Sequence, residues 1–169
     1  LVLDLRANPG GILDAAVTIA NRFVAAGALV ATRSRAETRI TKADEDEAHL
    51  AGTPLVILID ANSASASEVL AAALQDHGVA ALVGEPSYGK GSVQTLKHVD
   101  DERAVVKLTT AYYCSPSLRR IEHLEDDLER SGIAPDLLVP LARPEREAVY
   151  RFLFSYSPPA EALELLRGG

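Results

Sequence analysis

The chain contains one cysteine and neither tryptophan nor methionine. Because a disulfide needs two cysteines, Cys114 excludes an internal bridge, and cysteine usage does not indicate a redox compartment. A natural reading frame begins with methionine, so we expect these 169 residues to be part of a longer protein. No apolar run approaches the ~20 residues that span a membrane, and no signal peptide or repeat is visible. The residues by themselves therefore indicate neither membrane contact nor localisation.

Basic residues are also scarce. The chain has 17 Lys and Arg against 24 Asp and Glu, which gives a formal net charge of −7 and a pI near 5.1. A phosphate-backbone partner needs clustered cations, so we expect no binding to nucleic acid. Hydrophobic residues make up 47% of the chain, which is enough for one globular domain with a sizeable core.

The most informative stretch has the pattern of a strand, a turn and a helix. Residues 54–60 form an apolar run rich in β-branched side chains, and residues 69–76 are rich in Ala and Leu. The turn between them carries Ser63, Ser65 and Ser67. A hydroxyl at the start of a helix lies among amide groups without intrahelical partners, which favours a nucleophile there. Ser65 and Glu68 also match the Ser-x-x-Glu capping box, and this segment alone leaves both interpretations open.

A second unit of this kind begins the chain. Residues 1–5 are apolar, residues 6–11 read Arg-Ala-Asn-Pro-Gly-Gly, and residues 12–26 have apolar side chains at helical spacing, ended by Gly27. The two adjacent glycines let the loop present bare N–H groups at close range. Two such units predict an α/β core with both loops at the same strand ends.

The remaining elements follow from apolar runs and breaks. Further strands are expected at residues 28–33, 38–42, 79–83, 93–99, 104–113 and 136–140, with 93–99 and 104–113 paired. Acidic exposed segments are expected at 43–49 and 121–130, and helices beyond Pro144 and Pro159.

A serine nucleophile needs a base, and histidine is the usual one. His77 lies twelve residues beyond Ser65, about 18 Å along the same helix, and is too far away. The other histidines, His49, His98 and His123, lie in charged contexts typical of the surface. Lys90, held between two glycines, is the better candidate, although a lysine acts as a base only in its neutral form, which desolvation favours. A surface lysine in a flexible loop is the alternative.

Residues 84–90 also match the phosphate-loop pattern G-x-x-x-x-G-K. Gly91 occupies the position where that pattern needs Ser or Thr, and residues 93–99 are rich in β-branched side chains where it needs a helix. We therefore do not expect a nucleotide site.

Three separated segments together resemble the carboxyl-terminal processing proteases, the tail-specific serine peptidases of family S41. The segments are residues 4–11, residues 63–68 with 72–78, and residues 89–95, and the likeness extends over about residues 1–140. The resemblance implies a crotonase-like (ClpP-like) fold with a layered β/β/α core and helices packed on the sheets. It divides the chain into a protease core, residues 1–142, and a helical extension, residues 143–169, which we expect to pack on the same domain.

The resemblance also assigns roles to individual residues. It makes Ser65 the nucleophile, Lys90 the general base and Gln94 the group that orients the lysine amine; a solvent-facing strand residue is the alternative for Gln94. Ser63 and Ser67 become supporting hydroxyls. The implied oxyanion hole consists of the backbone N–H groups of Gly10, Gly11 and Ala66.

The implied reaction is peptide hydrolysis through an acyl-enzyme, with a polypeptide bound extended beside a sheet edge and without a metal or cofactor. Relatives in the family commonly carry a PDZ module, which is not in this chain and is expected elsewhere in the full-length protein. The resemblance further implies an extracytoplasmic location, in the bacterial periplasm or cell envelope. Leu118 occupies a position where the family often has Gly.

Two other functional classes remain as alternatives. The domain could be a catalytically silent scaffold of the same family, which an activity assay would separate from a protease. It could also be a crotonase-like acyl-CoA enzyme, which shares the oxyanion geometry but does not call for a Ser-Lys pair.

Overall fold

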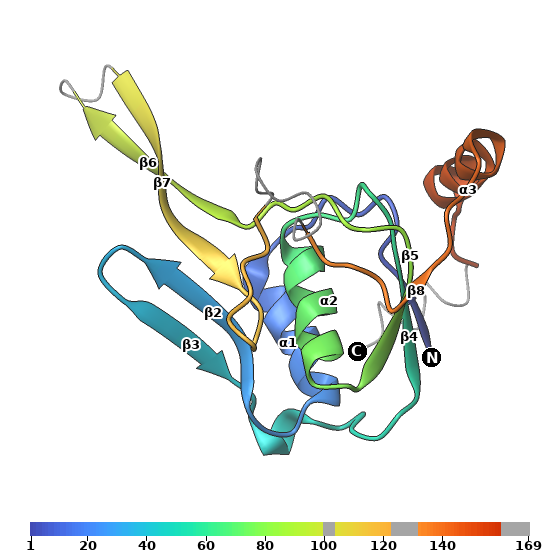
Figure 1. The fold of residues 1–169 in the computed structure, drawn as a ribbon, viewed down its shortest axis with the longest axis horizontal. Coiled ribbons are helices and arrows are strands. Elements are labelled where there is room, and N and C mark those ends of the chain that lie inside the picture. The colour runs from blue at the N-terminus through green and yellow to red at the C-terminus, as the bar shows by residue number, and fades with distance from the viewer. Residues whose placement is uncertain (100–103, 123–131, 160–169) are drawn as a thin grey trace. The chain divides into compact units, whose positions relative to one another are not determined.

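The computed structural model describes residues 1–99, 104–122 and 132–159 (Figure 1). The chain divides into two compact units, Leu1–Val139 and Pro140–Gly169. The second unit contains helix α3 (Arg143–Ser155), which confirms the helix predicted beyond Pro144. No helix within the described ranges is long and apolar enough to cross a membrane.

The first sheet is parallel and has the strand order β1-β4-β5-β8. Its strands are β1 (Val2–Asp4), β4 (Leu55–Ile59), β5 (Ala80–Gly84) and β8 (Leu137–Leu138). The apolar run of residues 54–60 forms the interior strand β4, which pairs in parallel with β1 and with β5. Because β1 and β4 are parallel neighbours, the loops that follow them leave the sheet at the same edge. This confirms the predicted placement of the glycine loop beside the serine turn.

The second sheet is antiparallel and has the order β3-β2-β7-β6. Its strands are β2 (Ala28–Ser34), β3 (Thr38–Lys42), β6 (Ser92–Val99) and β7 (Ala104–Cys114). β6 and β7 form the predicted pair, which runs from Ser92 opposite Tyr112 to Val99 opposite Ala104 with a register shift between Val93 and Gln94. Their connecting turn, residues 100–103, lies outside the described residues.

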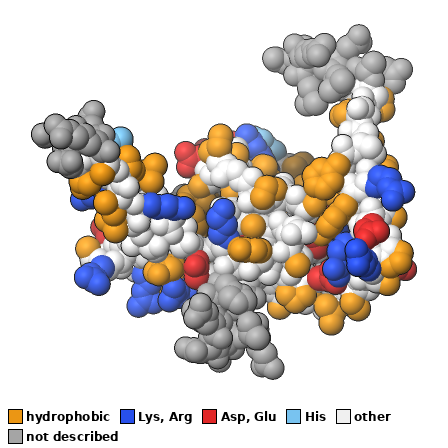
Figure 2. Space-filling view, turned by 90° about the horizontal axis from the view of Figure 1, so that it is seen from above, with side chains coloured by type: hydrophobic (Ala, Val, Ile, Leu, Met, Phe, Trp, Pro, Cys, Tyr) orange, Lys and Arg blue, Asp and Glu red, His pale blue; other side chains and the backbone are white. Residues whose placement is uncertain are grey.

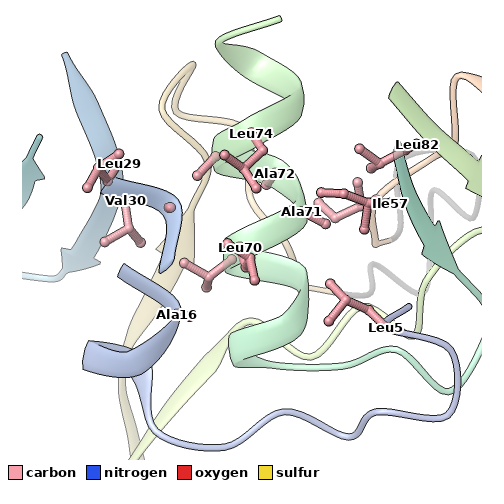
Figure 3. Close-up of a cluster of buried hydrophobic side chains, with 14 of the residues drawn as sticks. Leu5, Ala16, Leu29, Val30, Ile57, Leu70, Ala71, Ala72, Leu74 and Leu82 are labelled. Carbon is pink, nitrogen blue, oxygen red and sulfur yellow. The ribbon is translucent and has the colours of Figure 1, made fainter. Parts of the chain in front are cut away.

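Helices α1 (Leu13–Phe23) and α2 (Ala66–Asp76) lie between the two sheets (Figure 1). In Figure 3, Ile57 and Leu82 face α2 from the parallel sheet, and Leu29 and Val30 lie on its other side. Residues 66–74 of α2 are all buried. Small alanine side chains let a helix be covered on every side, and this packing fixes the start of α2, where Ser65 lies.

The α/β class is confirmed, with differences at element boundaries. The first helix ends at Phe23, three residues before the predicted end, because Val24 is extended and buried rather than helical. The strand predicted at residues 136–140 is reduced to β8, and the acidic segment at 43–49 contains the 3-10 helix η1 (Glu45–Glu47). The helix predicted beyond Pro159 and most of the acidic segment 121–130 lie outside the described residues.

Candidate active site

Ser65 is the N-cap of α2 and has a backbone conformation that is rare for residues other than glycine. Its φ is 57° and its ψ is −120°. A left-handed backbone at a serine costs free energy and recurs where a strained turn exposes a nucleophile between a strand and a helix. Ser65 and Glu68 form the capping-box arrangement, in which the Ser65 amide donates to Glu68 Oε2 at 2.8 Å. The structure therefore contains the Glu68 half of the predicted cap together with the strained turn, and the Ser65 hydroxyl forms no cap hydrogen bond.

Buried polar groups join the serine turn to the glycine loop. The Ser63 hydroxyl donates to the Leu5 carbonyl at 2.7 Å, and Asp60 Oδ1 accepts from the amides of Ala7 and Ser63 at 3.0 and 3.1 Å. The Ala64 amide donates to the Asn8 carbonyl at 3.0 Å. Ser63, which is 1% exposed, thus joins the two loops, and its role as a supporting hydroxyl in catalysis stays a prediction.

The glycine loop packs directly on the predicted nucleophile. A Cβ at Gly10, whose φ is 91°, would lie 2.8 Å from both Ser65 Cβ and the Ala66 amide nitrogen. The Gly10 amide already donates to Asn8 Oδ1 at 3.0 Å. Among the described residues, the structure gives no backbone partner for the amides of Gly11 and Ala66. Of the three predicted oxyanion donors, the amides of Gly11 and Ala66 can therefore donate to a substrate oxygen. The Gly10 amide is already bonded, but the absence of a side chain at Gly10 leaves room for Ser65.

Glu68 connects the nucleophile to the loop that carries the predicted base. Its carboxylate is fully buried, and Oε2 accepts from the amides of both Ser65 and Lys90, each at 2.8 Å. Oε1 accepts from the Gly89 amide at 2.6 Å and from the Ser87 hydroxyl at 2.5 Å. One carboxylate thus holds the backbones of Ser65 and Lys90 less than two hydrogen-bond lengths apart.

The side chain of Lys90 is exposed, although its backbone is held beside Ser65. Among the described residues, no hydrogen bond or ion pair of its amine is present, and it does not contact the Ser65 hydroxyl. The loop itself is well anchored, because the Tyr88 amide donates to the Ser63 carbonyl at 3.0 Å and a Cβ at Gly91 would lie 2.7 Å from the Glu122 amide nitrogen. The structure brings the backbones of Ser65 and Lys90 together and leaves the Lys90 side chain exposed to solvent.

Gln94 lies on β6 and is exposed. Its Nε2 donates to Thr109 Oγ1 on the neighbouring strand β7 at 2.7 Å. This cross-strand contact corresponds to the alternative of a strand residue facing solvent, and the role of Gln94 in orienting the lysine stays a prediction.

A small hollow of about 170 Å³ lies beside the predicted oxyanion donors. It is lined mainly by apolar or small residues of the glycine loop, α1 and α2, among them Ile12, Ala15, Ile19, Ala66 and Leu70. Within the described ranges, no group of three or more His, Cys, Asp or Glu is arranged to hold a metal ion.

The sequence profile of peptidase family S41 matches residues 1–139. The chain belongs to peptidase family S41. A carboxy-terminal-processing protease of Bartonella bacilliformis is 41% identical over 150 residues, which cover 88% of this chain and 33% of that protein. A carboxyl-terminal-processing protease of Synechocystis is 38% identical over 176 residues, which cover 99% of this chain and 37% of that protein.

The solved structure of a photosystem II D1 C-terminal processing protease resembles this S41 chain with a TM-score of 0.75 and 36% sequence identity. The match covers 94% of this chain and 40% of that one. The chain spans about a third of the length of the curated S41 relatives it matches.

Two connections in this S41 chain were missed by sequence reasoning. Glu68 was interpreted only as a helix cap, and Asp60 was assigned no role. The signal for Asp60 was its place directly after the apolar strand, where a carboxylate can accept from the amides of the turn that follows. No sequence signal linked Glu68 to the Lys90 loop, because the two segments are twenty-two residues apart.

Proposed function

We propose that this chain is the catalytic core of a serine endopeptidase of the C-terminal processing type, with Ser65 as nucleophile and Lys90 as general base. The observation that carries the proposal is the buried Glu68 carboxylate, which accepts hydrogen bonds from the backbones of both residues. The strained backbone of Ser65 and its contact with Gly10 support the same assignment.

In the proposed reaction, neutral Lys90 takes the proton of the Ser65 hydroxyl while the oxygen attacks a peptide carbonyl. The carbonyl oxygen, now negative, accepts from the amides of Ala66 and Gly11. Lys90 returns the proton to the leaving amine, and water then releases the acyl group from Ser65 as a free carboxylate. Because Lys90 is exposed in the structure, its side chain must rotate toward Ser65 when bound substrate excludes water.

The substrate of the proposed enzyme is a polypeptide bound in an extended conformation, through backbone hydrogen bonds that tolerate many sequences. The hollow of about 170 Å³ beside Ala66 would accept one small apolar side chain at the cleavage point. Its apolar lining provides no counter-ion for a charged side chain.

Three further proposals concern the whole protein. Two β-loop-α units with helices packed on the sheets support a crotonase-like (ClpP-like) layered core. Family membership supports an extracytoplasmic location, and relatives named as chloroplastic peptidases are found in Arabidopsis thaliana. It also supports a substrate-capturing PDZ module in another part of the full-length protein.

The test is cleavage of an unstructured polypeptide by the longest natural form of this protein. Ser65→Ala and Lys90→Ala are each expected to lower the rate on the order of 10³-fold. Lys90→Arg keeps the charge but cannot lose a proton, so it should be as inactive as Lys90→Ala. Lys97→Ala, which removes a lysine of β6 outside the Lys90 loop, is the matched control and should retain the wild-type rate. Full activity of Lys90→Ala would exclude the dyad.

A catalytically silent S41 domain is the second candidate, favoured by the exposed Lys90 side chain. In that case the longest natural form would cleave no polypeptide, and substitution of Ser65 or Lys90 would change nothing in the assay.

A further inference from the structure

A second, larger pocket lies in the antiparallel sheet, away from the hollow beside Ala66. It measures about 570 Å³, and its lining includes Arg33, Arg35 and Arg120 together with the hydroxyl side chains of Thr109 and Thr110. Figure 2 shows Lys and Arg side chains gathered over the region where Figure 1 places β2, β3, β6 and β7. Three guanidinium groups thus share one cavity in a chain whose net charge is −7.

None of these three arginines has a carboxylate partner among the described residues. Ion pairs do form at other arginines of the same unit: Arg6 with Asp4, Arg22 with Glu47, Arg39 with Glu37 and Arg119 with Asp76. The described arginines of this unit that lack an ion-pair partner are therefore concentrated in the pocket, where water or a bound anion would relieve their mutual repulsion.

Arg120 is held in place for such a ligand. Its guanidinium carbon lies 3.9 Å from the centre of the Tyr112 ring, and Tyr112 is directly opposite Arg33 in the pairing of β2 with β7. Among the described residues, its buried Nε has no hydrogen-bond partner. Buried N–H groups in native proteins almost always have a partner, so this donor points to an acceptor that the described residues do not supply.

One hydrogen bond connects the pocket to the strand that follows the Lys90 loop. Thr109 in its wall receives the hydrogen bond from Gln94, and Gln94 follows Lys90 by four residues. The pocket therefore lies on the sheet that the Lys90 loop enters. The size of the pocket suits a side chain or a chain end better than a single small ion.

We infer that this arginine pocket binds a carboxylate of a polypeptide, either an acidic side chain or a free C-terminus. The planar guanidinium matches a carboxylate through two parallel hydrogen bonds, and the threonine hydroxyls add further donors. The choice of a polypeptide rests on the proposed function, and the net negative charge of the chain disfavours a nucleic acid.

The inference is tested by binding of fluorescent ten-residue peptides to the Ser65→Ala protein, which cannot cleave them by the proposed route. One peptide has a central Asp-Glu pair and blocked ends, a second has no acidic side chain but a free C-terminus, and a third is neutral with blocked ends. We expect at least one of the first two to bind, more weakly at high salt, and the third not to bind. The peptide that binds identifies the source of the carboxylate.

The double substitution Arg33→Gln/Arg120→Gln should lower the affinity for the peptide that binds by at least tenfold. Arg35→Gln, which changes an exposed residue and so does not disturb the core, should weaken it severalfold. Arg120→Lys keeps the charge but loses the planar fork, and its effect should be intermediate. The matched control is Arg39→Gln on β3. Arg39 pairs with Glu37 outside the pocket, so this substitution should change peptide binding less than twofold.

Equal binding of the neutral peptide, or unchanged binding in both Arg33→Gln/Arg120→Gln and Arg35→Gln, would overturn the inference. So would binding of inorganic phosphate in the pocket without binding of either of the two peptides that carry a carboxylate. If Ser65→Ala and Lys90→Ala abolish cleavage while the arginine variants bind peptide normally, only the pocket inference fails. Because binding is measured without turnover, the pocket inference can hold even where the proposed peptidase activity is disproved.

Discussion

At the scale of single residues, the left-handed backbone of Ser65 has a counterpart with no assigned catalytic role. Leu118 has a φ of 66° and is exposed, in the turn where its amide donates to the Ser115 carbonyl at 2.9 Å. The left-handed conformation costs an L-residue roughly 1–2 kcal/mol, which glycine avoids. This agrees with the glycine that the family often has at this position.

We therefore expect Leu118→Gly to raise the free energy of unfolding by about 0.5–1 kcal/mol, after the greater unfolded-state entropy of glycine is subtracted. Urea denaturation would measure it. Leu96→Gly is the control, because Leu96 is also largely exposed but lies in the extended strand β6, where glycine should destabilise. A loss of stability in Leu118→Gly would show that contacts of the leucine outweigh its backbone strain.

The residue scale also shows where sequence reasoning was sufficient. The short pattern from Ser65 to Glu68 predicted both the cap and a hydroxyl at a helix start, because each depends on neighbours within one helical turn. The other bonds of Glu68 reach Ser87, Gly89 and Lys90, which only the tertiary fold brings near. The exposure of the Lys90 side chain corresponds to the alternative that the sequence left open, and sequence could not decide between the two because a rotamer depends on what surrounds it.

At the scale of secondary-structure elements, Glu68 fixes the loop of residues 85–91 to the start of α2. Replacing its carboxylate with an amide, Glu68→Gln, removes the charge and puts an NH₂ group where one oxygen accepts two bonds. Hydrogen bonds to a buried charge are strong, so we expect a loss of about 3 kcal/mol in the free energy of unfolding. Urea denaturation measures this loss.

The control for that substitution is Glu47→Gln. Glu47 is half-exposed and pairs with Arg22, so its loss should cost less than about 1 kcal/mol. Equal effects of the two substitutions would contradict a structural role for the four bonds to Glu68. In an active protein, Glu68→Gln should also lower cleavage, because Ser65 and Lys90 lose their common anchor.

The end of α2 has its own carboxylate contact, and it predicts a dependence on pH. Burial alone would raise the pKa of Asp76, but hydrogen bonds from Ser115 and Ser117 and the charge of Arg119 outweigh it and lower the pKa. A carboxyl whose pKa is lower in the folded state stabilises the fold above its unfolded pKa of about 3.9. That stabilisation is lost as the pH falls through the folded pKa.

Asp76→Asn should therefore cost about 1 kcal/mol in the free energy of unfolding at pH 7, and progressively less as the pH falls through the lowered folded-state pKa of the wild-type carboxyl. Urea denaturation at a series of pH values gives the comparison. Asp46→Asn, at an exposed position on η1, controls for the change in net charge. A cost that does not diminish at low pH would mean that the Asp76 charge contributes nothing.

Elements were predictable where the pattern was local and long. The apolar run that became β4 and the alternating stretches that became β6 and β7 were identified because their lengths and β-branched residues suit strands. Ends were less predictable, as at Val24, where burial rather than a glycine ends α1. The short strand β8 depends on pairing with β5, a contact more than fifty residues away along the chain.

At the scale of the whole molecule, local patterns predicted the α/β class and adjacent loops but not the order of strands. The antiparallel sheet joins β2 to β7, with Ala31 opposite Cys114, and nothing within either segment indicates its partner. The arginine pocket arises from this pairing, which places Arg33 opposite Tyr112 and so beside Arg120. A site made by distant strands is invisible to reasoning from motifs.

The division of the chain into units gives a prediction at the same scale. The first unit ends at Val139, directly after β8. The end of the protease core at residue 142 and the packing of residues 143–169 on the same domain stay predictions. No side chain in residues 140–159 is buried. Phe152, Phe154 and Tyr156 are all largely exposed.

Removal of residues 140–169 therefore takes no described side chain out of the core, and we expect the chain 1–139 to unfold cooperatively with a Tm within about 3 °C of the full chain, a change of roughly 1 kcal/mol. Circular dichroism during heating would measure the Tm. Removal of residues 137–169, which also deletes β8, is the matched comparison and should lower the Tm further, because the β5 edge loses its partner. If the two truncations lower the Tm equally and by more than about 10 °C, then residues 140–169 stabilise the protease core.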